Sequence, residues 1–345
     1  MLTLARVTIY DVAQEARCST ATVSLVLKKS DRIKPETQQR VMQAIHKLGY
    51  TPNYLAQSLS NKSTKTLGLI VPNIENPLFS QYIAGVEDYA RSQDYELILG
   101  ISNSNSEKED FYITMLQRKR VDGLLFFPTF LGALSEKISL LNSKDTPLVL
   151  CGSSGQGAVG LSYVKCDNRI GSFMAINHLI DTGCRRIGCI FPVIDRQQCQ
   201  SRLIGYQDAL YYHSLPYDEG LIRTCSPESE VIYEATRQFL QEKQPDGIFC
   251  LYDYAAIPVM KAIMSLGLRI PEDICLIGYD NIHLSAFTPI SLSTIDTHGA
   301  EVGRRSAELL IRKINNPEEP LHQVIIKPDL IVRESTAAVK PAAMG

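Results

Sequence analysis

The chain has 345 residues, of which 45% are hydrophobic and 21% charged, and its formal net charge is −2. A chain of this size and composition is expected to form two or three soluble globular domains. It has no apolar run of the roughly 18 residues that cross a bilayer, and its N-terminus lacks the basic and then apolar segments of a secretory signal. We therefore expect a cytoplasmic protein that does not contact a membrane.

The nine cysteines are an odd number, and they lie in apolar segments such as LVLCG and IGCIF, without CxxC spacing or histidine pairing. A free thiol in such a segment behaves as a small hydrophobe. We therefore expect reduced cysteines, no metal site and no cofactor.

The small net charge hides an asymmetry along the chain. Residues 1–65 carry ten Lys and Arg against four Asp and Glu, a net charge of +6, whereas the rest of the chain carries −8. A basic head on an acidic body indicates that the head binds a polyanion. The alternative is a basic surface that is simply solvated.

Two short helices with a tight connection are predicted at the start of the head. Thr8 and Asp11 have the spacing of a capping box that begins a helix over IYDVAQEA. Ser19 can cap a second helix over TATVSLVL, about three residues later, which is the spacing of a helix-turn-helix motif. A third helix begins near Pro35 and ends at Gly49, which supplies a left-handed stop.

The faces of these helices differ in character. Apolar residues at helical spacing form the expected core: Val12, Ala13, Ala16, Val23, Val26, Leu27, Val41, Ile45 and Leu48. The outward face of the second helix is uncharged and carries Thr20, Ala21, Ser24 and Leu25. Short side chains beside the cations Lys28, Lys29 and Arg32 suit the floor of a DNA major groove. A small bundle with an unspecialised outer surface is the alternative.

The segment YTPNYLAQSLSNKST, residues 50–64, predicts a helix of about two turns followed by a polar linker. So short a helix is marginal when it stands alone. Leu59 is exposed at its end and could wedge between base pairs in the minor groove. We expect this helix to be ordered only on DNA.

The body alternates apolar runs with amphipathic stretches. TLGLIVP, YELILGI, VDGLLFFP and PLVLCG are separated by helices around 79–93 and 107–119 and by one more before PLVLCG, and the pattern restarts at RRIGCIFP, PDGIFCLYD and DICLIGYD. Such alternation predicts parallel sheets with helices on both faces. VDGLLF and PDGIFC occupy matching places, which indicates two similar lobes with a ligand cleft at the carboxyl ends of their strands.

The sequence resembles the LacI/GalR family of bacterial transcriptional regulators. The resemblance is carried by VTIYDVAQEARCSTATVSLVL, PETQQRVMQAIHKLGYTPNYLAQSL and TLGLIVPNIENPLFSQYIAGVE, and it continues through RVDGLLFFP, SRLIGYQDAL, LRIPEDICLIGYDN and GRRSAELLI. It covers essentially the whole chain in order. It implies a homodimer whose heads bind a pseudo-palindromic operator in double-stranded DNA and whose bodies bind a small effector.

The resemblance implies an all-α helix-turn-helix head and an α/β two-lobed body of the periplasmic-binding-protein type. The expected divisions are a DNA-binding domain over 1–51, a hinge helix and linker over 52–64, a first lobe over 65–164 and 296–322, a second lobe over 165–295 and 323–336, and a tail over 337–345. That tail contains no apolar heptads, so we expect the assembly to stop at a dimer.

The family's DNA contacts carry over by position. The base-reading positions hold Thr20, Ala21 and Leu25, and the phosphate-contacting positions hold Thr8, Ser19, Thr22, Ser24 and Asn53, with Lys28 and Arg32 beside them. Leu59 falls on the minor-groove wedge and Ala56 where two hinge helices meet. Two residues depart from the pattern: Leu25 stands where Arg is usual and would contact a thymine methyl instead of guanine, and Arg17 stands where the turn usually has Gly.

The effector contacts implied by the resemblance are Phe79, which could stack on a ring, the polar pair Arg202 and Asp280, and the secondary members Asp167 and Asp253. An Arg with carboxylates and an aromatic face suits polyhydroxyl ligands such as sugars.

The identity of the effector stays open between two classes. Arg196 and Gln198 lie where purine-responsive members bind the base, which favours a purine corepressor. Cys225 replaces an aromatic residue at the same site, which argues against a flat purine and favours a sugar or sugar derivative.

Two other classes of protein share parts of this pattern. A solute-binding protein of the transport kind shares the two-lobed body but lacks the DNA-binding head. An enzyme would need a nucleophile–base pair, a phosphate-binding glycine loop or a metal spacing, and the GSSGQGAVG segment at 152–160 has no Lys-Ser/Thr after its glycines. We therefore predict a DNA-binding transcriptional regulator, a repressor in the first instance, and not an enzyme.

Overall fold

The computed structural model describes residues 7–27, 32–50, 63–118, 121–128, 146–152, 160–192 and 199–337. The chain forms two compact units, residues 1–64 and residues 65–345, here called the head and the body. Among the described residues, no helix is both long enough and apolar enough to cross a membrane.

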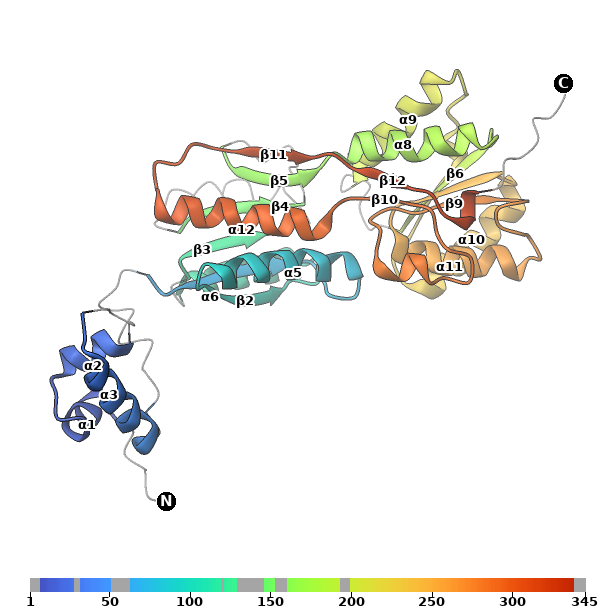
Figure 1. Ribbon diagram of the computed structural model, residues 1–345. Helices are drawn as coiled ribbons and strands as arrows, with labels where there is room; N and C mark the ends of the chain where they lie inside the picture. The colour runs from blue at the N-terminus through green and yellow to red at the C-terminus, as the bar shows by residue number, and fades with distance from the viewer. Residues whose placement is uncertain are drawn as a thin grey trace. The chain divides into compact units, whose positions relative to one another are not determined.

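The described part of the head contains three helices, α1 (Ile9–Glu15), α2 (Thr20–Leu27) and α3 (Pro35–Leu48), shown in blue in Figure 1. The predicted capping box is present, because the Asp11 carboxylate accepts a hydrogen bond from the Thr8 N–H at 2.7 Å. The Ser19 hydroxyl accepts one from the Thr22 N–H at 3.1 Å and caps α2. Gly49 ends α3 with φ 61°, as expected of a left-handed stop.

Small apolar side chains hold the three helices of the head together. The buried members are Val12, Ala13, Ala16, Val23, Val26, Val41, Ala44 and Tyr50, with Leu27, Ile45 and Leu48 partly buried around them. The residues predicted from helical spacing all belong to this core, and the structure adds Ala44 and Tyr50. Its residues are mostly valine and alanine, so the helices pack closely, but the apolar area that they bury is small.

The first lobe of the body is built on a six-stranded parallel sheet of order β11-β5-β4-β3-β1-β2. Its strands are β1 (Thr66–Val71), β2 (Glu96–Ile101), β3 (Gly123–Phe126), β4 (Leu148–Cys151), β5 (Ser162–Cys166) and β11 (Gln323–Ile326). Among the described residues, the helices that cover it are α5 (Pro77–Ser92), α6 (Ser106–Arg118) and α12 (Gly299–Asn315).

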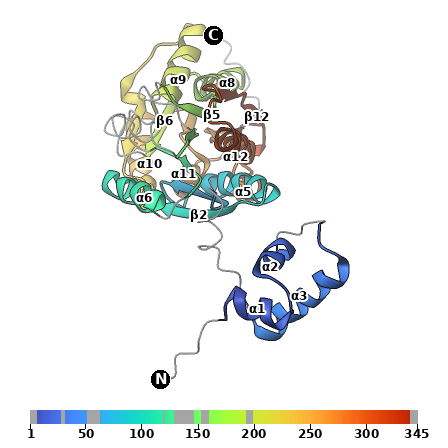
Figure 2. The ribbon, with the colours of Figure 1, turned by 90° about the vertical axis from the view of Figure 1, so that its left-hand side faces the viewer.

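Two separate cores cover the two faces of this sheet. Leu67, Leu69 and Val71 of β1 pack with α5 and α12 on one face, whereas Ile70 packs with α6 on the other. Figures 1 and 2 both show α5 and α12 side by side. Glycine permits this approach, because a Cβ atom on Gly85 of α5 would lie 1.9 Å from the Ala300 carbonyl oxygen of α12.

The second lobe is built on a four-stranded parallel sheet of order β7-β6-β8-β9. Its strands are β6 (Ile187–Pro192), β7 (Ile222–Cys225), β8 (Gly247–Cys250) and β9 (Cys275–Ile277). The helices α8 (Asn168–Asp181) and α9 (Gln200–Tyr212) pack on one face, and α10 (Ser229–Lys243) and α11 (Asp253–Ser265) pack on the other. These two lobes carry the parallel sheets, with helices on both faces, that the sequence predicts.

Short elements complete the second lobe. The strands β10 (Thr294–Asp296) and β12 (Asp329–Ile331) pair with each other in the antiparallel sense. The described part of this lobe also contains the short 3₁₀ turns η2 (Glu219–Leu221), η3 (His283–Ala286) and η4 (Glu334–Thr336).

The C-terminal strands correct one expected division. The sequence analysis assigns 323–336 to the second lobe, but β11, at Gln323–Ile326, is an edge strand of the first lobe's sheet. The Tyr163 hydroxyl of β5 donates a hydrogen bond to Gln323 Oε1 at 3.0 Å, which adds a side-chain contact to the strand pairing. The chain therefore crosses to the second lobe after Ile326.

Candidate nucleic-acid interface and effector site

The outward face of α2 is free of charge and carries short side chains. Ala21 and Leu25 are exposed, Leu25 at 37%, and Thr20, Thr22 and Ser24 are half-buried. Val23 and Val26, on the opposite face, lie in the core of the head. The helix thus presents methyl groups and hydroxyls to its surroundings, which suits contact with base edges and phosphates.

The polar rim of α2 lies at its N-terminus. The hydroxyls of Ser19 and Thr22 are 2.9 Å apart.

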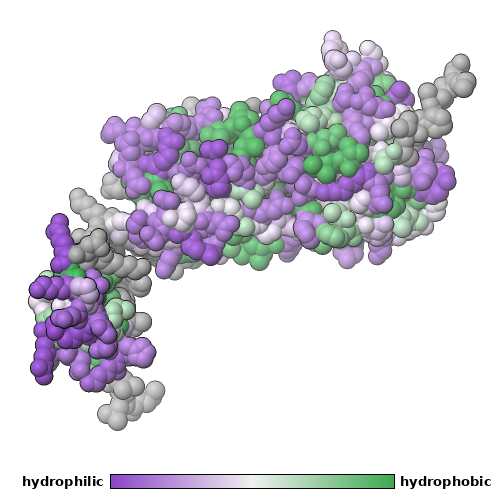
Figure 3. Space-filling model, in the orientation of Figure 1, coloured by the Kyte–Doolittle hydropathy of each residue, from purple (hydrophilic) through white to green (hydrophobic). Residues whose placement is uncertain are grey.

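Another polar group lies at the start of α1. The exposed Thr8 hydroxyl donates to Asp11 at 2.7 Å, and the hydrogen bonds from Thr8 hold the pKa of Asp11 below its usual range. The side of the head visible in Figure 3 is mostly hydrophilic. Arg32 is exposed.

Several expected DNA contacts cannot be placed in this arrangement. Lys28, Lys29, Asn53, Ala56 and Leu59 lie outside the described residues. Their roles therefore rest on the sequence alone.

In the body, Arg202 of α9 is the centre of a polar cluster. Its guanidinium donates to the Leu251 carbonyl, lies 3.4 Å from Asn168 Oδ1 and forms an ion pair with Asp280 at 3.2 Å. The Tyr279 ring lies beneath it, 3.9 Å from its centre. These contacts fix the orientation of a side chain that is 14% exposed.

Asp280 follows strand β9 in a loop and has φ 106°. Its N–H donates to the Ile295 carbonyl at 2.7 Å, which holds the carboxylate next to Arg202. Burial raises the pKa of Asp280 to about 8, and the charge of Arg202 opposes that rise.

This cluster lies where the two lobes meet. Gln81 of α5, in the first lobe, donates to the carbonyl oxygen of Asn281, in the second, at 3.1 Å. Burial and the nearby Asp280 raise the pKa of Tyr82, the residue after Gln81 in α5. The Tyr82 hydroxyl therefore lies within electrostatic reach of the Arg202–Asp280 pair, although it belongs to the other lobe.

Aromatic side chains gather on the first-lobe side of this junction. Phe79 lies with its ring centroid 6.3 Å from that of Tyr82 and 6.0 Å from that of Phe127. Tyr82 and Phe127 are 4.7 Å apart. Phe79, which the sequence analysis selected, is thus part of a three-ring group beside the polar cluster.

The secondary acidic residues have different positions. Asp253 is completely buried, and it accepts hydrogen bonds from Ser285 at 2.6 Å, Thr294 at 2.7 Å and the Ile282 N–H at 3.0 Å. Burial raises the pKa of Asp253 to about 6, and the bonds from Ser285 and Thr294 lower it. Its carboxylate ties three segments of the second lobe together.

Asp167 is half-buried and accepts from the Ile170 N–H at 3.1 Å, so it caps α8. Its own N–H donates to the Ile326 carbonyl at 3.0 Å, which places it where the chain crosses between lobes. Cys225 is half-buried at the end of β7. Arg196 and Gln198 lie outside the described residues.

Sequence reasoning missed Tyr82, Phe127, Asn168 and Tyr279. Phe127 comes directly after the buried strand β3 and Tyr279 two residues after β9, and a position at the end of a strand is a signal for a site, whereas Tyr82 has the pattern of an ordinary core residue of an amphipathic helix.

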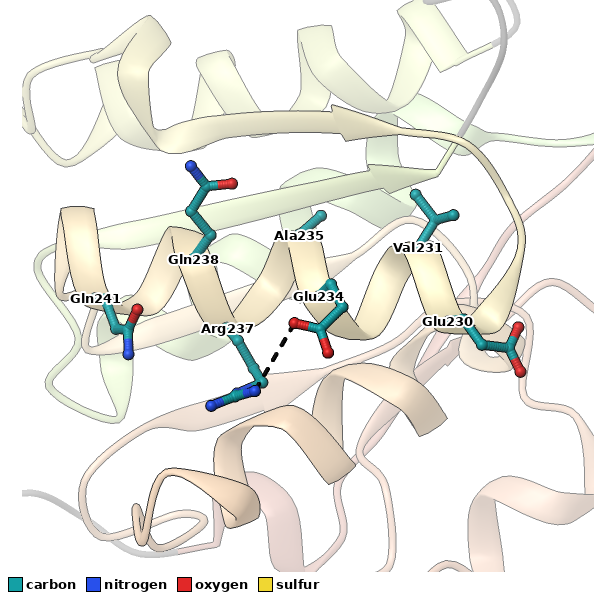
Figure 4. Close-up of a pocket in the computed structure, with 7 residues that line it drawn as sticks. All are labelled: Glu230, Val231, Glu234, Ala235, Arg237, Gln238 and Gln241. Carbon is teal, nitrogen blue, oxygen red and sulfur yellow. Dashed lines mark ion pairs between the residues drawn. The ribbon is translucent and has the colours of Figure 1, made fainter.

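A separate hollow of about 670 Å³, shown in Figure 4, lies along helix α10 of the second lobe. Its lining residues all belong to α10, where Glu234 and Arg237 form an ion pair at 3.8 Å. None of these residues was predicted to bind a ligand.

Both parts of the chain match known protein families. Residues 8–53 match the model for bacterial regulatory proteins of the lacI family, and residues 176–336 match the periplasmic binding protein-like domain. The HTH-type transcriptional repressor PurR of Aliivibrio salmonicida is 33% identical over 331 residues, which cover 95% of this chain and 98% of that protein. The chain belongs to the lacI family of bacterial regulatory proteins. It is a DNA-binding transcriptional regulator and not an enzyme, which confirms the prediction.

Other lacI-family relatives and solved structures agree with this assignment. PurR of Haemophilus influenzae (strain PittEE) is 33% identical over 336 residues, covering 96% of this chain and 99% of that protein. A complex of the regulator CelR with cellobiose is 26% identical, with a TM-score of 0.71 and coverage of 96% of this chain and 100% of that one. A LacI-family regulator from Enterococcus faecium with bound ribose is 28% identical, with a TM-score of 0.69 and coverage of 80% and 100%.

A Lac repressor dimer bound to operator and to the anti-inducer ONPF shares the fold. It is 23% identical, with a TM-score of 0.86 and coverage of 97% of this chain and 100% of that one. The predicted fold class, a helical DNA-binding head on a two-lobed α/β body, is confirmed.

Proposed function

We propose that this chain is an effector-controlled transcriptional repressor that binds operator DNA as a homodimer. Its effector is a small molecule bound between the two lobes of the body. The observation that carries the proposal is the Arg202–Asp280 pair of the second lobe, which adjoins Asn281, the residue whose carbonyl oxygen accepts a hydrogen bond from Gln81 of the first lobe. A ligand that touches both lobes can alter their closure and thereby DNA binding.

In the head, we propose that Thr20, Ala21 and Leu25 contact the base edges. Leu25 cannot donate a hydrogen bond, and its exposed side chain suits a thymine methyl. Phosphate contacts fall to Thr8, Ser19, Thr22, Ser24 and Asn53, with Lys28 and Arg32 adding charge, and the hinge contributes Ala56 and the Leu59 wedge.

For the effector we favour a sugar or sugar derivative. Arg202 offers a charged donor and Asp280 a carboxyl group to hydroxyls, Phe79 offers an aromatic face, and Cys225 leaves no second ring to sandwich a flat base. Asp167 and Arg196 are further proposed contacts, and Asp253 supports the Asp280 loop from behind.

A purine corepressor is the second candidate. It is favoured by the similarity over nearly the whole chain to relatives named PurR. Isothermal titration of the full chain with ribose, cellobiose, guanine and hypoxanthine separates the two. Binding of a saccharide alone supports the first candidate, and binding of a base alone supports the second and excludes the first.

A homodimer is supported by the edges of the body. Strand β2 is an edge of the six-stranded sheet, yet its side chains Leu97, Leu99 and Ile101 are at least partly exposed, Leu99 at 38%. An exposed apolar edge strand is a liability in a monomer and suits an interface. In the second lobe, Val231, Leu284 and Phe287 are also exposed. Sedimentation equilibrium of the full chain tests this: a monomer at micromolar concentration would refute it.

The decisive test of function has two steps. A palindromic duplex is first recovered by in vitro selection with the full chain, and binding of the full chain to this duplex is then titrated by fluorescence anisotropy. We expect specific, salt-dependent binding, and an altered affinity when the effector identified by calorimetry is added. A chain that binds the effector and no DNA would be a solute-binding protein instead.

A further inference from the structure

Arg17 occupies an unusual backbone position in the head. It lies in the turn between α1 and α2 with φ 50°. Its N–H donates to the Gln14 carbonyl at 3.2 Å, and the N–H of Cys18 donates to the Ala13 carbonyl at 2.9 Å. These two bonds form the Schellman arrangement that closes a helix, and its left-handed residue is normally glycine because a Cβ atom is strained there.

The strained side chain has no partner in the described head. Arg17 is exposed, and its guanidinium makes no hydrogen bond or ion pair with any described residue. The two carboxylates of α1 already have partners, Asp11 with Thr8 at 2.7 Å and Glu15 with Lys47 at 2.8 Å. By contrast, Arg40 donates to the Ala16 carbonyl at 2.9 Å and so stabilises the end of α1. The backbone strain at Arg17 therefore destabilises the folded head, and no contact of its side chain with a described residue offsets that strain.

The position of Arg17 relative to α2 indicates a role for its side chain. It lies two residues before Ser19, the cap of α2, and the N-terminus of a helix attracts phosphate. Ser19 and Thr22 are already proposed to contact phosphates, whereas Ala21 and Leu25 face the bases. A flexible guanidinium at the entry to this helix can reach the backbone that flanks the major groove and make bidentate contacts with it.

We propose that Arg17 is an additional DNA-contacting residue of this chain, which binds a backbone phosphate next to the N-terminus of α2. The proposal rests on α2 being the recognition helix. The contact adds affinity that is independent of base sequence, and it compensates in the complex for the strained backbone of the free head.

The test compares variants of the full chain on two duplexes, the selected palindrome and one of unrelated sequence, at several KCl concentrations. Arg17→Gly removes both the charge and the strain, Arg17→Asn removes the charge at a residue type that tolerates positive φ, and Arg17→Lys keeps the charge. Lys47→Gln is the matched control, because it also removes one positive charge from the head but lies on α3 in an ion pair with Glu15.

We expect Arg17→Gly and Arg17→Asn to lose about tenfold in affinity per head at low salt for both duplexes. The slope of log K against log[KCl] should become shallower by about one per head. Arg17→Lys should keep most of the slope, and Lys47→Gln should change little. Amide hydrogen exchange of residues 12–18 should be as slow in Arg17→Gly as in the wild type, or slower, which shows that the head is still folded.

Two results overturn the inference. The first is an Arg17→Gly variant whose DNA affinity and salt dependence equal those of the wild type. The second is an Arg17→Lys variant that loses as much DNA affinity as Arg17→Gly does. If the wild-type chain binds neither duplex, the proposed function fails instead, so the two failures are distinguishable.

Discussion

The head and the body of this regulator build their functional surfaces in different ways. In the head, the surface comes from α2, a helix of eight consecutive residues, and from the Ser19 cap before it. In the body, the polar cluster joins Arg202 to Asp280, and the neighbouring Asn281 accepts a hydrogen bond from Gln81 of the other lobe. The first surface is local in the sequence, and the second exists only when distant segments meet.

This difference also separates the energetics of the two parts. The head buries a few valines and alanines and carries a strained turn at Arg17, a penalty of roughly 1 kcal/mol. The body buries an Arg–carboxylate pair among four large cores, which cover both faces of each sheet. We infer that the head is the less stable of the two parts, because it buries less apolar area and carries a strained turn.

The largest expected effect concerns the head alone. Residues 1–60 should bind the selected palindrome at least about 100-fold more weakly than the full chain, because the proposed dimer contacts lie in the body and provide the avidity of two linked heads. Anisotropy titrations of both proteins at the same salt concentration measure the ratio. Equal affinities would show that the head dimerises by itself or that one head suffices.

Next in size is the loss of the effector response in the body. Arg202→Ala should weaken effector binding by about 100-fold or more, because it removes the charged donors and leaves Asp280 buried without its cation. Operator affinity without effector should stay near that of the wild type. Arg269→Ala, which removes an exposed guanidinium paired with Asp273 at 2.8 Å, is the control. A normal effector response in Arg202→Ala would show that the ligand binds elsewhere.

A smaller effect is expected at the hinge. Leu59→Ala should lower operator affinity by about tenfold, because the wedge that offsets the cost of unstacking a base step is lost. A central pyrimidine–purine step should be preferred, since it kinks most easily. The melting temperature should not change. A lowered melting temperature with unchanged affinity would mean that Leu59 packs against its own chain.

The remaining prediction is a pH dependence of the body's stability. The folded-state pKa of Asp280, about 8, lies above the value of about 4 for an unfolded aspartate. The folded state therefore holds the proton more tightly, and the free energy of unfolding should fall as the pH rises through this range. Urea unfolding at pH 6 and pH 8 measures the fall. Asp280→Asn should reduce it, and an equal fall in the variant would assign the dependence to other groups.

The sequence predicts what local spacing determines. The capping box at Thr8, the cap at Ser19, the stop at Gly49 and the strand–helix alternation of the body depend on neighbours within a few residues, and the structure contains all of them. Arg202, Asp280 and Phe79 were reached through the family resemblance, and the structure places them around the lobe junction.

What the sequence does not predict depends on long-range contacts. The buried Asp253 looks like a ligand contact in the sequence, because a carboxylate after a strand signals a site, but its hydrogen bonds to Ser285 and Thr294 become visible only after folding. The strand Gln323–Ile326 joins the first lobe through pairing with a strand about 160 residues earlier. Tyr82 has the pattern of a helix core residue, and its nearness to Asp280 depends on how the lobes meet.

The central claim, that a ligand between the lobes controls DNA binding by the head, is tested most directly by linkage. The operator affinity of the full chain is measured without effector and with saturating effector, and the effector affinity is measured without and with operator. We predict a change of at least about fivefold in both, by the same factor, because coupling between two sites is reciprocal. An effector that binds the body with Arg202-dependent affinity but leaves the operator affinity unchanged would contradict the account.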